Sequence, residues 1–282
     1  MLDTPVGWLL LFLLGTFTGT LSGLLGIGGG LLMVPALTIF RVPLVQATAT
    51  SLVGVFLSAV SGSVRNFSTG ELNWRVSLAL ALFGMITAQV GAWLGDRLPD
   101  AVLSLAFAGL LLFTIYLMNL RQRLKRKEMA DEQANSAGYS QNYSLPKEEN
   151  SSLESATSSI SQQFGAIASI GLAAGLLSGL FGVGGGVVMV PLQMLFLGES
   201  IKSAVRTSLG AIVPIAISGL AQHTWNGNVL WIPGLCLGLG GIIGAQFGTR
   251  LLPRLPDRQV NLIFRLFLIA LSVYMVLRAI AV

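Results

Sequence analysis

Apolar segments long enough to cross a membrane follow one another along most of this chain, separated by short polar turns. A helix needs about 20 apolar residues to cross a bilayer. The segments run over residues 7–40, 44–64, 76–95, 101–120, 164–197, 203–222, 231–250 and 260–281. This pattern predicts an all-α polytopic membrane protein.

A long polar segment, residues 121–163, divides the apolar segments into two groups of four. It is rich in Ser, Asn, Gln and Glu and holds few large apolar side chains, a composition typical of disorder. We therefore expect a first transmembrane repeat over residues 1–120, a disordered linker over 121–163 and a second transmembrane repeat over 164–282.

The two halves are copies of each other. Residues 15–35 (GTFTGTLSGLLGIGGGLLMVP) and 171–191 (GLAAGLLSGLFGVGGGVVMVP) are identical at 13 of 21 positions. Farther along, residues 84–100 and 241–257 are identical at 10 of 17 positions. The chain is thus an internal duplication.

The first segment of each half is too long for one crossing. A helix of 34 residues would be about 50 Å long, whereas the hydrocarbon core is about 30 Å thick. The glycine run at residues 26–30 therefore has to turn the chain into a hairpin of two shorter helices. A hairpin followed by about three transmembrane helices gives each half an odd number of crossings, so the two repeats have inverted topology.

The distribution of charge supports inversion. Inverted repeats place 14 of the 17 basic residues on the side of the linker, whereas parallel repeats place 9 there. Because cytoplasmic loops are enriched in Lys and Arg, the linker is predicted to be cytoplasmic. With 53% hydrophobic and 10% charged residues, we expect an integral protein of the cell membrane (the inner membrane in a two-membrane cell), and the net charge of +5 does not indicate nucleic-acid binding.

The glycine breaks are the first candidates for an anion-binding site. Gly28, Gly29 and Gly30 each precede or open a helix, as do Gly184, Gly185 and Gly186. Glycine backbone followed by a helix start presents free N–H groups and the positive end of the helix dipole. Close helix packing is the alternative explanation, and it is favoured for Gly15, Gly19 and Gly23.

Other polar residues inside the apolar segments are further candidates. Hydroxyl groups at Thr50, Ser51, Thr207 and Ser208 either donate to an anion or bond back to their own helix. The repeated Gln89 and Gln246 either join helices or line the path. The ionisable candidates Arg65, Arg206 and His223 lie near segment ends, where extension toward the interface is the alternative to a site.

Enzymatic function is not expected. No HExxH motif, P-loop or cluster of metal ligands is present, and position 31 is Leu where a dinucleotide-binding fingerprint needs Gly. We accordingly expect no metal and no cofactor.

The duplicated phrases SGLLGIGGGLLMVP and SGLFGVGGGVVMVP, followed by ATSL and RTSL, resemble the sulfite exporter TauE/SafE family. The resemblance covers residues 7–120 and 164–281. It implies a membrane permease that moves sulfur-containing or small organic anions, such as sulfite or sulfoacetate.

The sequence therefore predicts a secondary transporter that works by alternating access, with its site between two inverted repeats. An anion channel with a glycine-lined pore is the alternative. The expected partners are a small anion, the lipid bilayer, a coupling ion (proton or sodium) and, for the oligomer, a second copy of the chain.

Overall fold

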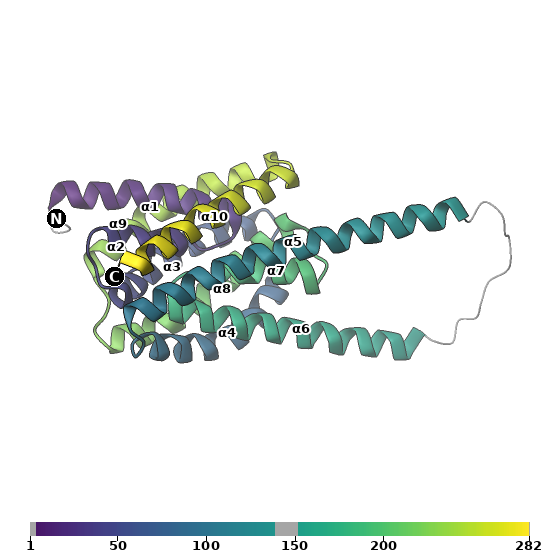
Figure 1. Cartoon of the computed structure of the whole chain (residues 1–282), viewed down its shortest axis with the longest axis horizontal. Coiled ribbons are helices and arrows are strands. Elements are labelled where there is room, and N and C mark those ends of the chain that lie inside the picture. Colours follow the sequence, from purple (N-terminus) through teal and green to yellow (C-terminus); the bar gives the residue numbers. More distant parts are fainter. Residues whose placement is uncertain (1–3, 139–151, 282) are drawn as a thin grey trace.

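The computed structural model describes residues 4–138 and 152–281, and all regular structure in these ranges is helical. The all-α prediction is confirmed (Figure 1). The helices are α1 (Pro5–Leu25), α2 (Gly30–Ile39), α3 (Leu44–Ser68), α4 (Trp74–Gly95), α5 (Asp100–Gly138), α6 (Ser152–Phe181), α7 (Gly186–Phe196), α8 (Ile201–Trp225), α9 (Trp231–Leu251), the short 3₁₀ helix η2 (Leu252–Arg254) and α10 (Asp257–Ala281).

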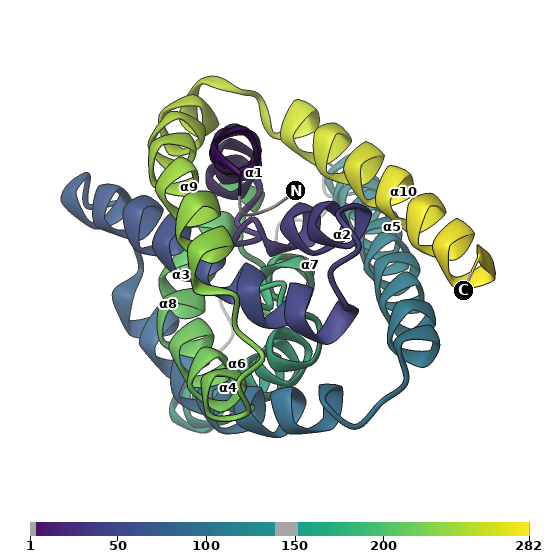
Figure 2. The same cartoon turned by 90° about the vertical axis from the view of Figure 1, so that its left-hand side faces the viewer.

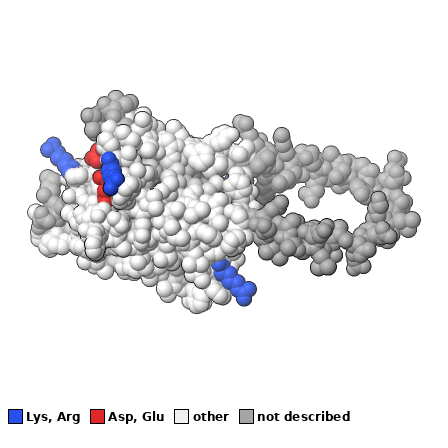
Figure 3. Space-filling model, turned by 90° about the horizontal axis from the view of Figure 1, so that it is seen from below, with Lys and Arg blue, Asp and Glu red and all other residues white. Residues whose placement is uncertain are grey.

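Within the described ranges, 8 helices are long and apolar enough to cross a membrane, and α2 and α7 are shorter apolar helices. Large apolar side chains cover the outside of these helices, as a lipid environment requires, and Leu82 and Phe247 are examples. Figure 3 shows the coloured charged side chains near the two ends of the helical body, with an uncoloured surface between them. The prediction of an integral membrane protein is thus supported by both length and surface.

The long first segment of each half is broken, as predicted. Helix α1 ends at Leu25 and is capped by Gly26, which has φ of 68° and whose N–H donates to the Ser22 carbonyl at 2.8 Å. Gly28 and Gly29 both have φ of 83°, and α2 then begins at Gly30. The second copy repeats this backbone, with φ of 67° at Gly182 and 82° at Gly184. Because L side chains rarely adopt this region, the turn depends on glycine.

The first helix of each half packs against a helix of the other half. Figure 2 shows α1 beside α9, α6 beside α4, and α5 beside α10, and these are close contacts. Glycine makes the approach possible, since a Cβ on Gly23 would lie 2.6 Å from the Ala245 carbonyl oxygen. The packing explanation for Gly15, Gly19 and Gly23 agrees with this geometry.

The predicted linker is partly helical. Helix α5 continues to Gly138 and α6 begins at Ser152, whereas the composition of residues 121–163 indicated disorder. The physical reason is that Arg, Lys, Glu, Gln, Met and Ala dominate residues 121–134 and have high helix propensity, so a membrane helix can continue into water. Residues 139–151 lie outside the described ranges. The domain boundaries stay predictions.

The helical body has two ends. The linker end is where α5 leaves the body and α6 enters it, and the far end is the opposite one, where α1 begins (Figure 1). Helix α1 thus starts from the far end and α6 from the linker end. Which end faces which side of a membrane stays a prediction.

Candidate functional site

The two glycine breaks are joined by a pair of equivalent hydrogen bonds. Ser51 of α3 donates to the Gly182 carbonyl at 2.8 Å, and Ser208 of α8 donates to the Gly26 carbonyl at 2.9 Å. Both hydroxyl groups also lie within hydrogen-bond distance of a carbonyl of their own helix, three residues earlier. These serines therefore brace the breaks, each holding the break of the other half.

The breaks are in direct contact with each other. A Cβ on Gly30 would overlap the Gly182 carbonyl oxygen, and a Cβ on Gly186 would overlap the Gly26 carbonyl oxygen. Val55 of α3 and Ile212 of α8, which occupy equivalent positions, pack against Gly28 and Gly184. The centre of the molecule is consequently filled by two glycine turns and two apolar side chains.

The helix starts at the breaks offer hydrogen-bond donors. The capping residues Gly29 and Gly185 provide no side-chain acceptor, so the first N–H groups of α2 and α7 receive no side-chain cap. Ser22 and Ser178 are 1% and 0% exposed, and their hydroxyl groups have no hydrogen-bond partner among the described residues. The Ser22 Cβ is 3.6 Å from where a Cβ on Gly29 would lie. Amides without a side-chain cap, helix dipoles and hydroxyls without a described partner together suit an anion.

The remaining polar candidates have different surroundings. The Thr50 hydroxyl accepts a hydrogen bond from the Leu230 N–H at 3.0 Å, whereas the equivalent Thr207 hydroxyl is buried and has no partner in the described part of the chain. Gln246 donates to both the carbonyl and the hydroxyl of Ser61 at 3.0 Å, and so joins α9 to α3. Gln89 is exposed on α4. The structure therefore groups the glycines and serines but not the glutamines.

The charged candidates are engaged away from the breaks. Arg206 forms an ion pair with Glu71 at 2.8 Å at the linker end, and Arg65 lies half-buried in the last turn of α3. The fully buried His223 lies between Asp96 and the Gly179 carbonyl. At the corner before α8, burial raises the pKa of Glu199, and a hydrogen bond from Ser203 opposes this.

Sequence reasoning missed several residues at or near the breaks. Ser58 donates to the Gly28 carbonyl at 3.0 Å. Its equivalent in the second half is Ile215, so comparison of the two halves does not single out Ser58. Gln193 is 0% exposed with both amide atoms unpaired, and as a lone polar residue in an apolar segment it could have been noticed. Asp96 was overlooked because it follows the last residue of α4.

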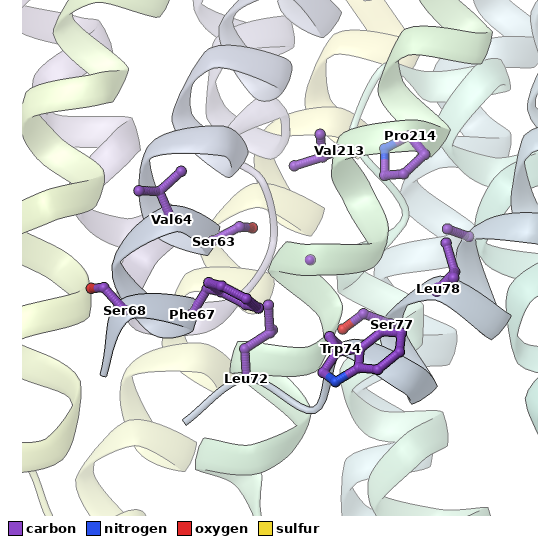
Figure 4. A pocket seen from close by; sticks show the side chains of 12 residues that line it. Ser63, Val64, Phe67, Ser68, Leu72, Trp74, Ser77, Leu78, Val213 and Pro214 are labelled. Carbon is purple, nitrogen blue, oxygen red and sulfur yellow. The ribbon is translucent and has the colours of Figure 1, made fainter. Parts of the chain in front are cut away.

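An apolar cavity of about 490 Å³ opens between α3, α4 and α8. Figure 4 shows Phe67, Leu72 and Trp74 around it, with Val213 and Pro214 on the α8 side. A cavity with so few polar atoms offers an anion no compensation for lost water. The breaks, and not this cavity, are thus the candidate anion site. Among the described residues there is also no group of three or more His, Cys, Asp or Glu side chains that could hold a metal ion.

Comparison with known proteins gives a consistent result. The sequence model of the family described as "Sulfite exporter TauE/SafE" matches residues 11–275. The chain is 25% identical over 249 residues to the probable membrane transporter protein YdhB of Bacillus subtilis (strain 168), covering 88% of this chain and 91% of that protein. It is 26% identical over 276 residues to YunE of the same organism, also described as a probable membrane transporter protein, covering 95% and 96%.

An archaeal relative is similar over the same length. The probable membrane transporter protein MJ0441 of Methanocaldococcus jannaschii is 24% identical over 283 residues, covering 95% of each chain. No solved structure matches the chain.

Proposed function

This chain belongs to the sulfite exporter TauE/SafE family, and from that premise we propose that it moves small sulfur-containing or organic anions, such as sulfite or sulfoacetate, by alternating access. The coarser conclusion, a membrane transporter of the TauE/SafE type, follows from the family and from relatives described as probable membrane transporters. The family match likewise points to transport and not to an enzyme class.

The observation that carries the proposal is the pair of helix starts at the two breaks. Each offers N–H groups without a side-chain cap, and the buried hydroxyls of Ser22 and its repeat equivalent Ser178 have no partner among the described residues. An oxyanion with several acceptor atoms can receive such donors from two directions. Binding through backbone dipoles also avoids the large cost of burying a charged side chain in the membrane.

Alternating access is supported by the way the halves hold each other. The Ser51–Gly182 and Ser208–Gly26 hydrogen bonds are equivalent, so each half holds the break of the other half through one hydrogen bond. Val55 and Ile212 fill the space between the glycine turns. An anion entering there has to displace them, and this coupling of binding to rearrangement is typical of a carrier. A permanently open channel would need a continuous path instead.

The arrangement in the membrane completes the proposal. The two halves, 1–120 and 164–282, form inverted repeats in the cell membrane (the inner membrane in a two-membrane cell), with the linker in the cytoplasm. Of the 11 basic residues outside the linker, eight flank the α3–α4, α7–α8 and α9–α10 connections, and the positive-inside rule then favours the linker end as the cytoplasmic end. A proton or sodium ion is the expected coupling ion, and a homodimer the expected oligomer.

The test is counterflow of labelled sulfite and sulfoacetate in proteoliposomes, with Gly29→Ala as the site variant. A Cβ on Gly29 would meet no atom closer than 3.3 Å, so the fold tolerates it apart from the cost of φ at +83°, about 1–2 kcal/mol. The added methyl group occupies space beside Ser22 at the start of α2, so counterflow and anion-induced thermal stabilisation are expected to be lost.

The matched control is Gly70→Ala, which has φ of +71° and no atom within 4 Å of an added Cβ. This substitution has a similar cost of positive φ, but it lies in the loop after α3 and away from the breaks. The variant should therefore transport like the unaltered protein. Equal transport by both variants would contradict the site, and single-channel currents would contradict the carrier.

A further inference from the structure

The buried imidazole of His223 contacts two oxygen atoms, one at each ring nitrogen. Its Nε2 lies 3.1 Å from the Gly179 carbonyl oxygen of α6, and its Nδ1 lies 3.3 Å from Oδ1 of Asp96, at ion-pair distance though not aligned as a hydrogen bond. The His223 side chain is 1% exposed and that of Asp96 is 15% exposed. A buried ionisable side chain in a helix of a membrane protein is a functional hypothesis by default.

The chemistry of these contacts favours a bound proton. A carbonyl oxygen only accepts hydrogen bonds, and so does an ionised carboxylate. A neutral imidazole donates from one nitrogen and would leave the other contact without a hydrogen. Both contacts are made together when the pair holds one extra proton, which gives an imidazolium beside a carboxylate.

The pair connects four elements at the far end. Asp96 follows α4, and its carboxylate accepts from Asn226 and, at 2.9 Å, from Asn228 in the turn between α8 and α9. His223 belongs to α8, and Gly179 lies in α6 three residues before Gly182, where the second break begins. The pair is thus connected through the end of α6 to the second break.

Two other charged groups at this end are engaged elsewhere. The Arg97 guanidinium stacks on Trp93, 3.7 Å from the ring centroid, and Asp100 accepts from the Leu44 N–H at 3.3 Å. One turn before His223, the neighbours of Gly219 are Leu52 of α3, Gly179 of α6 and Ala88 of α4, all uncharged. Among the described residues, Asp96 is therefore the titratable group that faces the imidazole.

The equivalent position at the linker end has no such pair. His223 corresponds to Asn66, which is 2% exposed and whose Nδ2 finds no partner within the described ranges, and Asp96 corresponds to Pro253. The two halves make equivalent hydrogen bonds to the breaks through Ser51 and Ser208, but they differ at the position of His223. The far end holds a titratable pair there, and the linker end holds a neutral amide.

We propose that His223 and Asp96 form a proton-binding site that keeps the far end of the transporter closed. Proton loss removes one of the two contacts of the imidazole, which loosens α6 from Asp96 and lets the far end open. The proposal rests on the proposed transport function for its role, but the proton site itself rests on the geometry alone. A proton that binds one conformation more tightly shifts the equilibrium toward it.

The first measurement does not need transport. His223 is the single histidine of the chain, so ¹⁵N-histidine labelling of protein without a histidine tag reports on this ring alone. If the pair holds a proton, the ring is doubly protonated at the acid end of the range of about pH 5–8 and neutral at its alkaline end. In Asp96→Asn the charged ring loses its partner and should be neutral over this range. A neutral ring in the unaltered protein throughout would overturn the proposal.

The second measurement is the pH profile of sulfoacetate counterflow, because sulfoacetate keeps its charge over this range whereas sulfite does not. Counterflow by the unaltered protein should be about tenfold slower at the acid end of the range, where the far end stays closed. His223→Asn, which introduces the residue found at position 66, should give a flat profile; His223→Gln serves if that variant misfolds.

Asn228→Ala is the matched control, since it removes a hydrogen bond to the same carboxylate but no titratable group, and it should keep a pH-dependent profile. If His223→Asn transports with the unaltered profile, the pair does not control the far end. If the ring titrates as expected but no anion is transported, the proposed function fails and the proton site stands.

Discussion

At the scale of single residues, four serines of similar burial have different hydrogen bonding. Ser51 and Ser208 each bond to a break, whereas Ser22 and Ser178 have no partner. A typical hydrogen bond contributes about 1 kcal/mol to stability. Ser51→Ala should therefore lower the free energy of unfolding by about that amount, as measured by thermal or denaturant unfolding in detergent.

Ser22→Ala, in contrast, should not lower the free energy of unfolding. Because its hydroxyl has no bond to lose, stability should be unchanged or slightly higher, while anion affinity falls by about 5- to 10-fold if that hydroxyl donates to the substrate. Anion titration monitored by thermal shift measures both properties in one experiment. A Ser22→Ala variant that is as unstable as Ser51→Ala, with unchanged affinity, would contradict its assignment to the site.

The sequence identified the glycines and Ser51 and Ser208 because duplication marks them. It did not identify their partners, since a repeat shows which residues are equivalent but not which ones touch. The bond from Ser51 reaches Gly182 in the other half. Ser58, Gln193 and Asp96 lack an identical copy, so the feature that exposed the others was absent.

At the scale of helices, the closest approach depends on glycine faces. A Cβ on Gly244 of α9 would overlap the Thr16 carbonyl oxygen of α1 and lie 2.6 Å from the Thr20 nitrogen. Gly244→Ala should force this pair apart and cost about 1–3 kcal/mol. Gly109→Ala in α5, where no atom lies within 4 Å, should be neutral or stabilising. The two variants are compared by heating and then measuring the remaining folded protein by size-exclusion chromatography. Equal stability would show that the contact between α1 and α9 tolerates a side chain at position 244.

The helix limits were largely predictable, because each apolar segment corresponds to one helix or to one broken pair. The exception was the segment after residue 120. Its polarity indicated disorder, but polarity reports on solvation, whereas Arg, Lys, Glu and Ala also form stable helices in water. Helix α5 continues to Gly138 for that reason.

At the scale of the whole molecule, the proposed inverted repeats predict which parts share a side of the membrane. Figure 1 shows the N-terminal start of α1 and the end of α10 at the far end, opposite the linker. A fluorescent reporter in the linker should be active in the cytoplasm, and an alkaline phosphatase fused after the last residue should be active outside it. Both reporters active on the same side would rule out the inverted arrangement.

The packing of α1 against α9 also has a consequence for synthesis. The ribosome completes α1 and α2 long before it makes Trp231, the first residue of α9, an interval of tens of seconds at usual rates. During that time Gly15, Gly19 and Gly23 have only lipid against them, and the Gly26 carbonyl awaits Ser208. The first hairpin is therefore inserted early, but it gains its packing partners late. A chain that terminates before α9 leaves the glycine face of α1 uncovered, and quality-control proteases can recognise that face.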